Sequence, residues 1–288
     1  MIKPFLSLLS DHMEQVAKEK DAYYKNRPYA HYPSSASAIT PDGSVVGACL
    51  RNQYWKAIKE PSEEQWSLPS QLQRGFGDAI HDWLFAKLKK IDGFVLTAEH
   101  AGKLTVDGLS REISYRMDGH VVIGDKVGGV ELKTSQGRAI DKMIKEGGPK
   151  EHHILQVLDY FNANPNFSFF SMMYVARDSG YSVEYHIRRD KDSFYLSQVY
   201  PFVGPERELK HLTLASMKAR RKALETAVES KTLPPRDYKV FLNKDGEIQE
   251  MRQSKGEKYK SDFWCLYCDY AKKCWSMPDA KANEKEIK

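Results

Sequence analysis

Four cysteines constrain this chain more than any other feature. One lies early, at Cys49, and three lie late, at Cys265, Cys268 and Cys274, in a Cys-x2-Cys-x5-Cys run. A chain of 288 residues without a secretion signal is a poor candidate for a disulfide scaffold, so four thiols favour a metal centre, either structural Zn²⁺ or a four-iron cluster. Such a centre would bring together segments 216 residues apart (265 − 49), unless the four are unrelated buried cysteines.

The composition is that of an ordinary globular protein, with 41% hydrophobic residues. The formal net charge of +5, from 44 basic and 39 acidic residues, suits a polyanionic partner but is equally common without one. No apolar run approaches the roughly 20 residues that span a bilayer, so no membrane association is predicted. The first stretch, MIKPFLSLLSDHMEQ, lacks a basic start and a small-residue cleavage site, which predicts a helix and a cytoplasmic protein.

Amphipathic periodicity predicts several helices. The first three cover residues 1–24, 47–58 and 69–90, with a Ser- and Pro-containing loop between the first two. In the third helix we expect six apolar side chains on or near one core-facing side, namely Leu72, Phe76, Ile80, Trp83, Leu84 and Leu88. Further helical patterns cover residues 151–163 and 190–230, the second interrupted near two prolines.

Short β-branched or alternating segments predict strands between these helices. Four of them, separated by Gly and Asp turns, cover residues 94–100, 111–119, 120–125 and 126–134. A hairpin is predicted between residues 168–178 and 181–189. This order of elements predicts an α/β fold with a central mixed β-sheet flanked by helices.

A carboxylate and a lysine share one face at the end of the strand that covers residues 126–134. Glu131 and Lys133 are two residues apart, so both point to the same side while Leu132 points into the core. Asp118 closes an upstream strand, and two carboxylates on neighbouring strands can hold Mg²⁺ or Mn²⁺. A surface salt bridge is the alternative. The acid-x-Lys triplets that begin at Glu208, Asp237 and Glu286 lack this context.

Three further polar residues have spacings that suit a site. Gln156 and Tyr160 are four residues apart on one helical face, where an amide and a phenol can hydrogen-bond a phosphate. The alternative is a core tyrosine with a solvated neighbour. His81 lies in the helix predicted at 69–90 and could serve as one imidazole ligand beside carboxylates, although a lone helical histidine is more often structural.

Together these residues resemble the RecB-type exonuclease branch of the PD-(D/E)XK nuclease superfamily. The resemblance spans about Cys49 to Cys274 and rests on six residues in the expected order, His81, Asp118, Glu131-x-Lys133 and Gln156-x-x-x-Tyr160. It implies that the histidine, the aspartate and the Glu-x-Lys pair build the metal site, and that the Gln–Tyr helix follows. The chain departs from the family pattern at Met117, where a proline usually precedes the aspartate.

The resemblance implies a restriction-endonuclease-like fold and a particular use of the cysteines. CRISPR-associated and AddB-like nucleases of this branch carry one early cysteine and a late triplet that bind a 4Fe-4S cluster, and CLRNQYWKA, which begins at Cys49, is similar to their Cys-x-Arg-x-x-Tyr start. On spacing alone Zn²⁺ is the commoner occupant, and the resemblance favours the cluster. We expect an N-terminal helix and loop over residues 1–46, the nuclease domain with its metal staple over residues 47–278, and a disordered tail over residues 279–288.

The function implied is that of a Mg²⁺- or Mn²⁺-dependent DNA exonuclease that acts on single strands or free ends, in recombination, repair or phage- or CRISPR-linked processing. The chain contains no nucleotide-binding Gly-x4-Gly-Lys-Ser/Thr loop, so a helicase or recombinase partner is expected to supply the ends. Predicted DNA contacts are Arg51, Tyr54 and Arg74, with Trp55 or Trp83 stacking on bases. Two alternatives are a non-catalytic, cluster-stapled DNA-binding or assembly module and a zinc protein of unrelated function.

Overall fold

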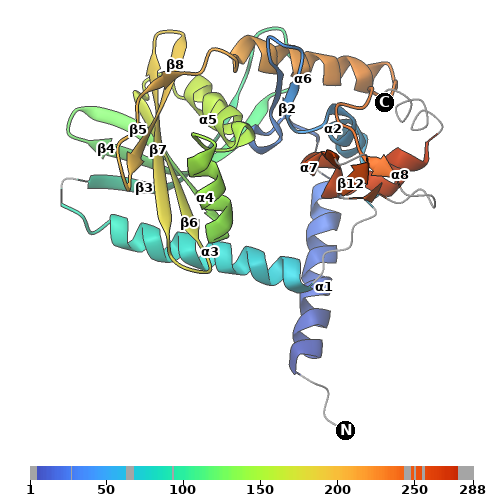
Figure 1. Ribbon diagram of the computed structural model, residues 1–288, viewed down its shortest axis with the longest axis horizontal. Helices are drawn as coiled ribbons and strands as arrows, with labels where there is room; N and C mark the ends of the chain where they lie inside the picture. Colours follow the sequence, from blue (N-terminus) through green and yellow to red (C-terminus); the bar gives the residue numbers. More distant parts are fainter. Residues whose placement is uncertain are drawn as a thin grey trace.

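The computed structural model describes residues 5–26, 28–62, 68–92, 94–242, 248–249, 251–254 and 257–277. Its centre is a seven-stranded sheet in the order β3-β4-β5-β6-β7-β8-β9, with helices packed against it (Figure 1). β5 and β6 run parallel, and the other neighbouring pairs of this sheet are antiparallel. The prediction of an α/β fold with a central mixed sheet flanked by helices is confirmed.

The strands of this sheet follow the chain order from one edge to the other. They are β3 (Phe94–Leu104), β4 (Ile113–Ile123), β5 (Lys126–Ser135), β6 (Phe169–Ala176), β7 (Ser182–Asp190), β8 (Ser193–Tyr200) and β9 (Arg207–Glu208). Between β5 and β6 the chain forms α4 (Gly137–Lys145) and α5 (Glu151–Ala163), because a parallel pair needs a crossover connection. β6 and β7 form the predicted hairpin, with Val175 paired to Ser182.

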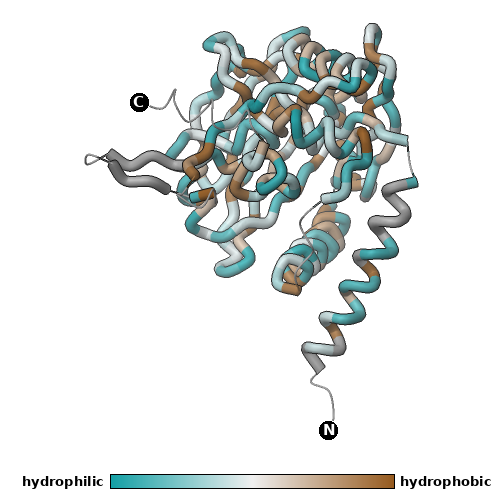
Figure 2. Tube along the Cα trace, turned by 90° about the vertical axis from the view of Figure 1, so that its right-hand side faces the viewer, coloured by the Kyte–Doolittle hydropathy of each residue, from teal (hydrophilic) through white to brown (hydrophobic). Residues whose placement is uncertain are grey.

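Two hydrophobic cores hold the helices on the sheet. The larger core lies under α4, α5 and α6 (Leu214–Glu229), where Phe161, Phe170 and Met217 are buried. The smaller core lies under α3 (Leu68–Leu88), whose Phe85 packs on Leu132 of β5. α1 (Phe5–Lys25) contacts α3 and projects from the main body, with its N-terminal end pointing away (Figure 2).

The strands predicted at 111–119 and 120–125 are one continuous strand, β4, so the prediction of a turn between them is wrong. Gly119 lies inside this strand, at a position where the neighbouring side chains leave no room for a Cβ atom. A Cβ atom there would lie 2.8 Å from Leu96 Cδ1 and 2.9 Å from Phe85 Cε1. The glycine therefore permits close packing of α3 and β3, and Asp118 lies within the strand instead of at its end.

The helix predicted from residue 190 to residue 230 is wrong in its first half. Residues 193–200 form β8, in which Phe194 and Leu196 are buried at alternate positions, as the two-residue period of a strand requires. The helix α6 begins only after Thr213, whose side-chain oxygen accepts a hydrogen bond from the backbone N–H of Ser216.

The apolar side predicted for the third helix is correct only in part. Ile80, Leu84 and Leu88 pack against the smaller core. Phe76 and Trp83 are 61% and 62% exposed and point away from it. The face of α3 that contacts the sheet is therefore narrower than the six apolar residues suggest.

The polar segment predicted as a loop before residue 47 contains regular structure. It holds a short 3-10 helix (Pro33–Ser35) and the antiparallel pair β1 (Ser37–Ile39) and β2 (Val45–Gly47). Ser216 of α6 ties this hairpin to the body, since its hydroxyl donates to Ile39 O and accepts from Ile39 N, both at 2.7 Å.

The N- and C-terminal parts of the chain meet, as the cysteine positions predict. α2 (Leu50–Ala57) lies beside α7 (Phe263–Leu266) and α8 (Ala271–Ser276) in a third hydrophobic core (Figure 1). The chain reaches α7 through four short strands, β10 (Phe241–Leu242), β11 (Ile248–Gln249), β12 (Met251–Ser254) and β13 (Glu257–Lys260). The tail predicted at 279–288 lies outside the described residues. None of the described helices is long and apolar enough to cross a membrane.

Candidate functional site

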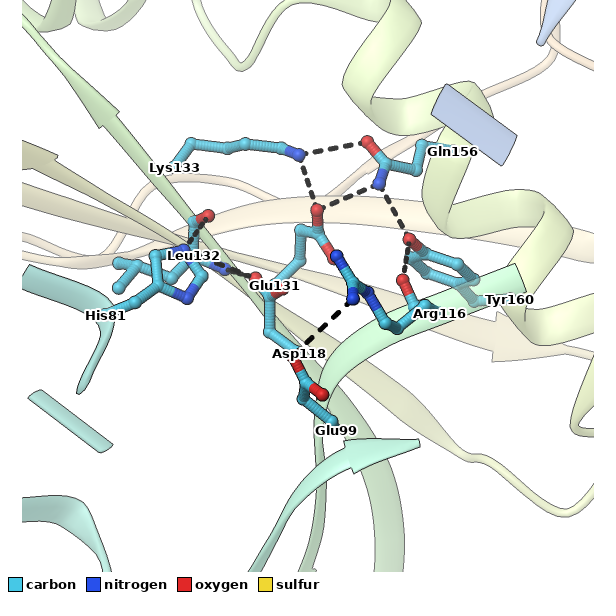
Figure 3. A network of polar contacts seen from close by, with 9 residues as sticks. All are labelled: His81, Glu99, Arg116, Asp118, Glu131, Leu132, Lys133, Gln156 and Tyr160. Atoms are coloured by element: carbon cyan, nitrogen blue, oxygen red, sulfur yellow. Dashed lines mark hydrogen bonds and ion pairs between the residues drawn. The ribbon is translucent and has the colours of Figure 1, made fainter. Parts of the chain in front are cut away.

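The candidate site forms where β4 and β5 separate (Figure 3). The ladder between these strands ends at the pair Gly119–Val130, one residue short of both Asp118 and Glu131. Asp118 Oδ2 replaces the missing strand acceptor by accepting a hydrogen bond from Leu132 N at 2.8 Å. The gap in the ladder places two carboxylates side by side, as the sequence predicts for neighbouring strands.

Glu131 forms the centre of a polar network above this gap (Figure 3). Its Oε1 accepts hydrogen bonds from Lys133 Nζ at 2.5 Å and from Gln156 Nε2 at 2.9 Å. Lys133 Nζ also donates to Gln156 Oε1 at 3.0 Å, so three side chains close a ring of hydrogen bonds. Leu132 points the other way and is 2% exposed, which confirms the predicted alternation.

The second carboxylate oxygen of Glu131 is left without a partner. Glu131 is 3% exposed, and its Oε2 has no hydrogen-bond partner among the described residues. A buried polar atom in this state costs free energy, so it calls for a physical explanation such as a bound ion. This oxygen is the position in the site at which a cation would be favoured most.

Burial dominates the electrostatics of both carboxylates. It raises the pKa of Glu131 to about 7, while the Lys133 ammonium opposes that rise and the neighbouring Asp118 adds to it. Burial likewise raises the pKa of Asp118, against the attraction of His81 and of Lys133. Asp118 therefore disfavours the ionised form of Glu131, an effect that a divalent cation beside both carboxylates would reverse.

His81 reaches the site from α3. Its Nε2 lies 2.9 Å from Leu132 O and 3.6 Å from Asp118 Oδ2. A carbonyl oxygen can only accept, so Nε2 carries the proton and donates it. In this orientation His81 positions the β5 backbone and Asp118, and it would need to turn its ring to serve as the predicted metal ligand. Gly77, one turn earlier, lets α3 approach β5 at Thr134.

Gln156 and Tyr160 lie on one face of α5, as predicted, and bind each other. Gln156 Nε2 donates to Tyr160 OH at 2.7 Å, and that hydroxyl donates to Arg116 O at 2.9 Å. Tyr160 is 1% exposed and packs in the larger core. The geometry therefore favours a supporting role for Tyr160, with Gln156 holding Lys133 and Glu131.

The sequence analysis did not identify Glu99, which lies opposite Asp118 on β3. The β3–β4 pairing is interrupted there, between Ala98–Gly119 and His100–Met117, and Glu99 has a φ of 40°. Its carboxylate lies 4.0 Å from Arg116, and both side chains are largely exposed (Figure 3). The strand prediction at 94–100 contained Glu99, but no local signal marks the interruption.

Two of the predicted DNA contacts are buried. Arg51 is 3% exposed and donates to Pro234 O at 2.8 Å, and Tyr54 is 7% exposed in the core beneath α8. Trp55, a predicted stacking residue, is 3% exposed and packs on Tyr270. These side chains hold the C-terminal segment in place and offer no surface to a DNA strand. The remaining predicted contact, Arg74 on α3, is exposed.

The four cysteines come from the two ends of the chain to one region. Cys265 and Cys274 are buried in the third core, and Cys268 packs against it. Burial raises the pKa of the Cys265 thiol, and Cys49, Cys268 and Cys274 each raise it further, so these three cysteines lie within electrostatic range of Cys265. Burial also raises the pKa of Cys49 to about 11.

Side chains of α2 donate hydrogen bonds to these sulfurs. Asn52 Nδ2 lies 3.2 Å from Cys268 Sγ, and Arg51 Nη1 lies 3.7 Å from Cys274 Sγ. Both contacts supply N–H donors to sulfur, whereas burial raises the pKa of the Cys49, Cys265 and Cys268 thiols and so favours their neutral form.

Neither predicted metal centre is formed as a ligand set in this structure. Among the residues that it describes, no group of three or more His, Cys, Asp or Glu side chains has an arrangement that could hold a metal ion. The expected four-cysteine cluster is therefore not seen, and both centres stay predictions.

Comparison with known proteins gives no family and only distant likeness to solved structures. No family model matches the chain, and no curated protein matches it. Among solved structures, the chain is similar to the protein described as "Crystal structure of SSO0001", with 17% identity, 92% of this chain and 96% of that chain covered, and a TM-score of 0.42. A TM-score this low does not establish a common fold.

Proposed function

We propose that this chain is a metal-dependent DNA exonuclease that hydrolyses phosphodiester bonds at DNA ends, as its resemblance to the RecB-type PD-(D/E)XK nucleases implies. One observation carries the proposal, namely the buried Oε2 of Glu131, which has no partner among the described residues. A divalent cation beside Glu131 and Asp118 would satisfy that oxygen and neutralise two carboxylates that now repel each other.

The donor set suits Mg²⁺ or Mn²⁺. Asp118 and Glu131 offer the carboxylate oxygens that these ions prefer, and His81 could add one nitrogen after its ring turns. When bound, the metal supplies hydroxide near neutral pH and neutralises charge that develops on the phosphoryl group.

Lys133 and Gln156 complete the proposed machinery. Lys133 Nζ bridges Glu131 and Gln156, so its charge is held beside the carboxylate that the cation would share. From there it can position the attacking water or stabilise negative charge on phosphorus. Gln156 fixes both partners, and Tyr160 fixes Gln156.

The first test is degradation of end-labelled single- and double-stranded DNA with Mg²⁺ or Mn²⁺. Glu131→Ala and Lys133→Ala should each reduce cleavage by about 100-fold or more, because each removes a charge at the reacting centre. The matched controls are Glu208→Ala and Lys210→Ala, which change a Glu-x-Lys pair at the end of β9, the edge strand of the sheet, where the two side chains form an ion pair at 3.4 Å.

The control variants should cleave at the wild-type rate. Circular dichroism of all four variants should match the wild type, which separates loss of chemistry from loss of folding. Wild-type cleavage by Glu131→Ala or Lys133→Ala would show that the catalytic centre has been assigned to the wrong residues.

We further propose that the four cysteines bind a 4Fe-4S cluster, with Zn²⁺ as the alternative. The proposal is supported by the convergence of the four thiols and by the donors on Arg51 and Asn52. A brown protein that contains iron and sulfide would support the cluster, and a colourless protein that contains zinc would support the alternative.

The second candidate function is a non-catalytic DNA-binding or assembly module with the same staple. It predicts DNA binding without cleavage under every metal condition, including in the presence of a helicase or recombinase that supplies ends. The complete ring of Glu131, Lys133 and Gln156 favours the enzyme, since a module without activity has no use for a buried carboxylate with an unsatisfied oxygen.

A further inference from the structure

Two exposed aromatic rings stand together at α7. Phe263 is 53% exposed and Tyr267, one turn later, is 71% exposed. Their ring centroids are 4.9 Å apart with a tilt of 44° between the rings. Single exposed apolar side chains are ordinary, but two large rings in contact form an apolar surface that suits a ligand with flat faces.

Positive charge adjoins these rings. Lys150 Nζ lies 5.3 Å from the centroid of the Phe263 ring, and Lys150 has no carboxylate partner among the described residues. Burial and the neighbouring Lys142 both lower the pKa of Lys150, so two ammonium groups lie within electrostatic range of each other. Lys142 is paired with Glu146 at 3.5 Å. A strand with an anionic backbone and aromatic bases matches this combination.

The rings and the lysine connect directly to the candidate site. Lys150 is the residue before α5, and His152 in the first turn of that helix contacts the ring of Trp264, beside Phe263, at 5.0 Å. Gln156 follows His152 by one helical turn and hydrogen-bonds Lys133. The contact between Trp264 and His152, and the helical turn from His152 to Gln156, therefore link the exposed surface to the hydrogen-bond partner of the proposed catalytic lysine.

We infer that Phe263, Tyr267 and Lys150 form a stacking platform that binds a single-stranded DNA end and leads it to Lys133. The inference rests on the proposed function and specifies its substrate. In a duplex both faces of each base are already stacked on neighbouring pairs, whereas an unpaired base can lay a free face on Phe263 or Tyr267. The lysine would contact the phosphates, so its contribution should depend on salt.

The test is binding of a labelled phosphorothioate oligonucleotide, which resists hydrolysis, measured by fluorescence anisotropy without added divalent metal. Phe263→Ala and Tyr267→Ala should each weaken single-strand binding about tenfold, with little change for blunt duplex. Lys150→Ala should weaken binding of both forms and reduce the salt slope by about one. Phe263→Trp should restore binding, and its fluorescence should be quenched by the single strand.

The matched control is Phe202→Ala, which removes a phenylalanine of similar exposure, 56%, just after β8. It should leave binding unchanged. Wild-type single-strand affinity in both Phe263→Ala and Tyr267→Ala would overturn the platform, as would equal losses for single strand and duplex. The binding assay does not measure cleavage. If the protein cleaves DNA normally but the aromatic variants bind single strands as the wild type does, only the platform inference is wrong. If Phe263→Ala and Tyr267→Ala bind single strands tenfold more weakly but Glu131→Ala cleaves DNA at the wild-type rate, the platform stands and the catalytic role of Glu131 is wrong.

Discussion

The buried charge of Glu131 depends on hydrogen bonds from neighbouring side chains. Glu131 is stabilised through Oε1 by Lys133 and Gln156, and its other oxygen is uncompensated among the described residues. The pairing of Glu131 with Lys133 was predictable, because a two-residue spacing on a strand gives a common face. The spacing of Gln156 and Tyr160 predicted a phosphate contact, but the hydrogen bond from Gln156 to Glu131 was not predicted, since 25 residues and a helical crossover separate them.

His31 provides a test of buried charge away from the site. It is 1% exposed, and burial lowers its pKa below the ordinary value of 6.5, although Glu225 opposes this effect; Arg221 and Arg111 add to it. Below about pH 6.5 the unfolded chain therefore binds a proton that the folded chain resists, so stability falls as the pH falls. We expect His31→Gln to flatten this loss by up to about 1.4 kcal/mol per pH unit in urea unfolding between about pH 7 and pH 5.

The control for His31 is the exposed His12 on α1. His12→Gln should retain the wild-type dependence of stability on pH. An unchanged slope in His31→Gln would mean that the buried imidazole is not the group responsible.

Several helices and strands were predictable from their local sequence patterns. α5 and the β6–β7 hairpin follow from their patterns, whereas β8 was taken for a helix because its aromatic residues and the prolines after it disguise the two-residue period. The exposed Phe76 and Trp83 show the opposite error on α3. Periodicity identifies an element, but its neighbours decide how wide a face is covered.

The contact between α5 and α6 depends on a buried ion pair. Arg221 and Asp159 form two hydrogen bonds, with side chains 8% and 1% exposed. Burial raises the pKa of Asp159 and Arg221 counteracts it, so Arg221→Met would leave a carboxylate buried without its partner. We expect a loss of about 3–5 kcal/mol in the free energy of unfolding, measured with urea.

Two further variants make this prediction specific. Arg188→Met removes an exposed arginine that also makes two hydrogen bonds, to Glu206, and should cost far less. Arg221→Met combined with Asp159→Leu should recover most of the stability, because no charge is then left buried. A double variant as unstable as the single one would argue that packing, not charge, is responsible.

At the scale of the whole molecule, α2 joins the C-terminal helices. Trp55 packs on Tyr270 at 5.2 Å, and Lys56 pairs with Asp269 at 3.0 Å. These contacts close the chain on itself without a metal. The aromatic ring of Trp264 then links the C-terminal helices to His152 on α5, so the thiols and the candidate site share one framework.

The proposed cluster adds a link across this joint. Cys49→Ser and Cys265→Ser should each lose bound metal and destabilise the loaded protein by similar amounts, on the order of 5 kcal/mol by analogy with a cross-link over 216 residues (265 − 49). The double variant should lose no more than either single variant, because both cysteines hold one link. Urea unfolding with parallel metal analysis checks this. Additive losses, or equal losses in metal-free protein, would contradict a shared centre.

The sequence by itself determined the type of most elements and the common face of Glu131 and Lys133. These features depend on local periodicity and on residue chemistry that a linear pattern records. Only the tertiary structure decided that β4 and β5 separate at Asp118, that Arg51 and Tyr54 are buried, and that Phe263 and Tyr267 stay exposed beside Lys150. Such features depend on which segments pack together, and packing between distant segments leaves no local period to read.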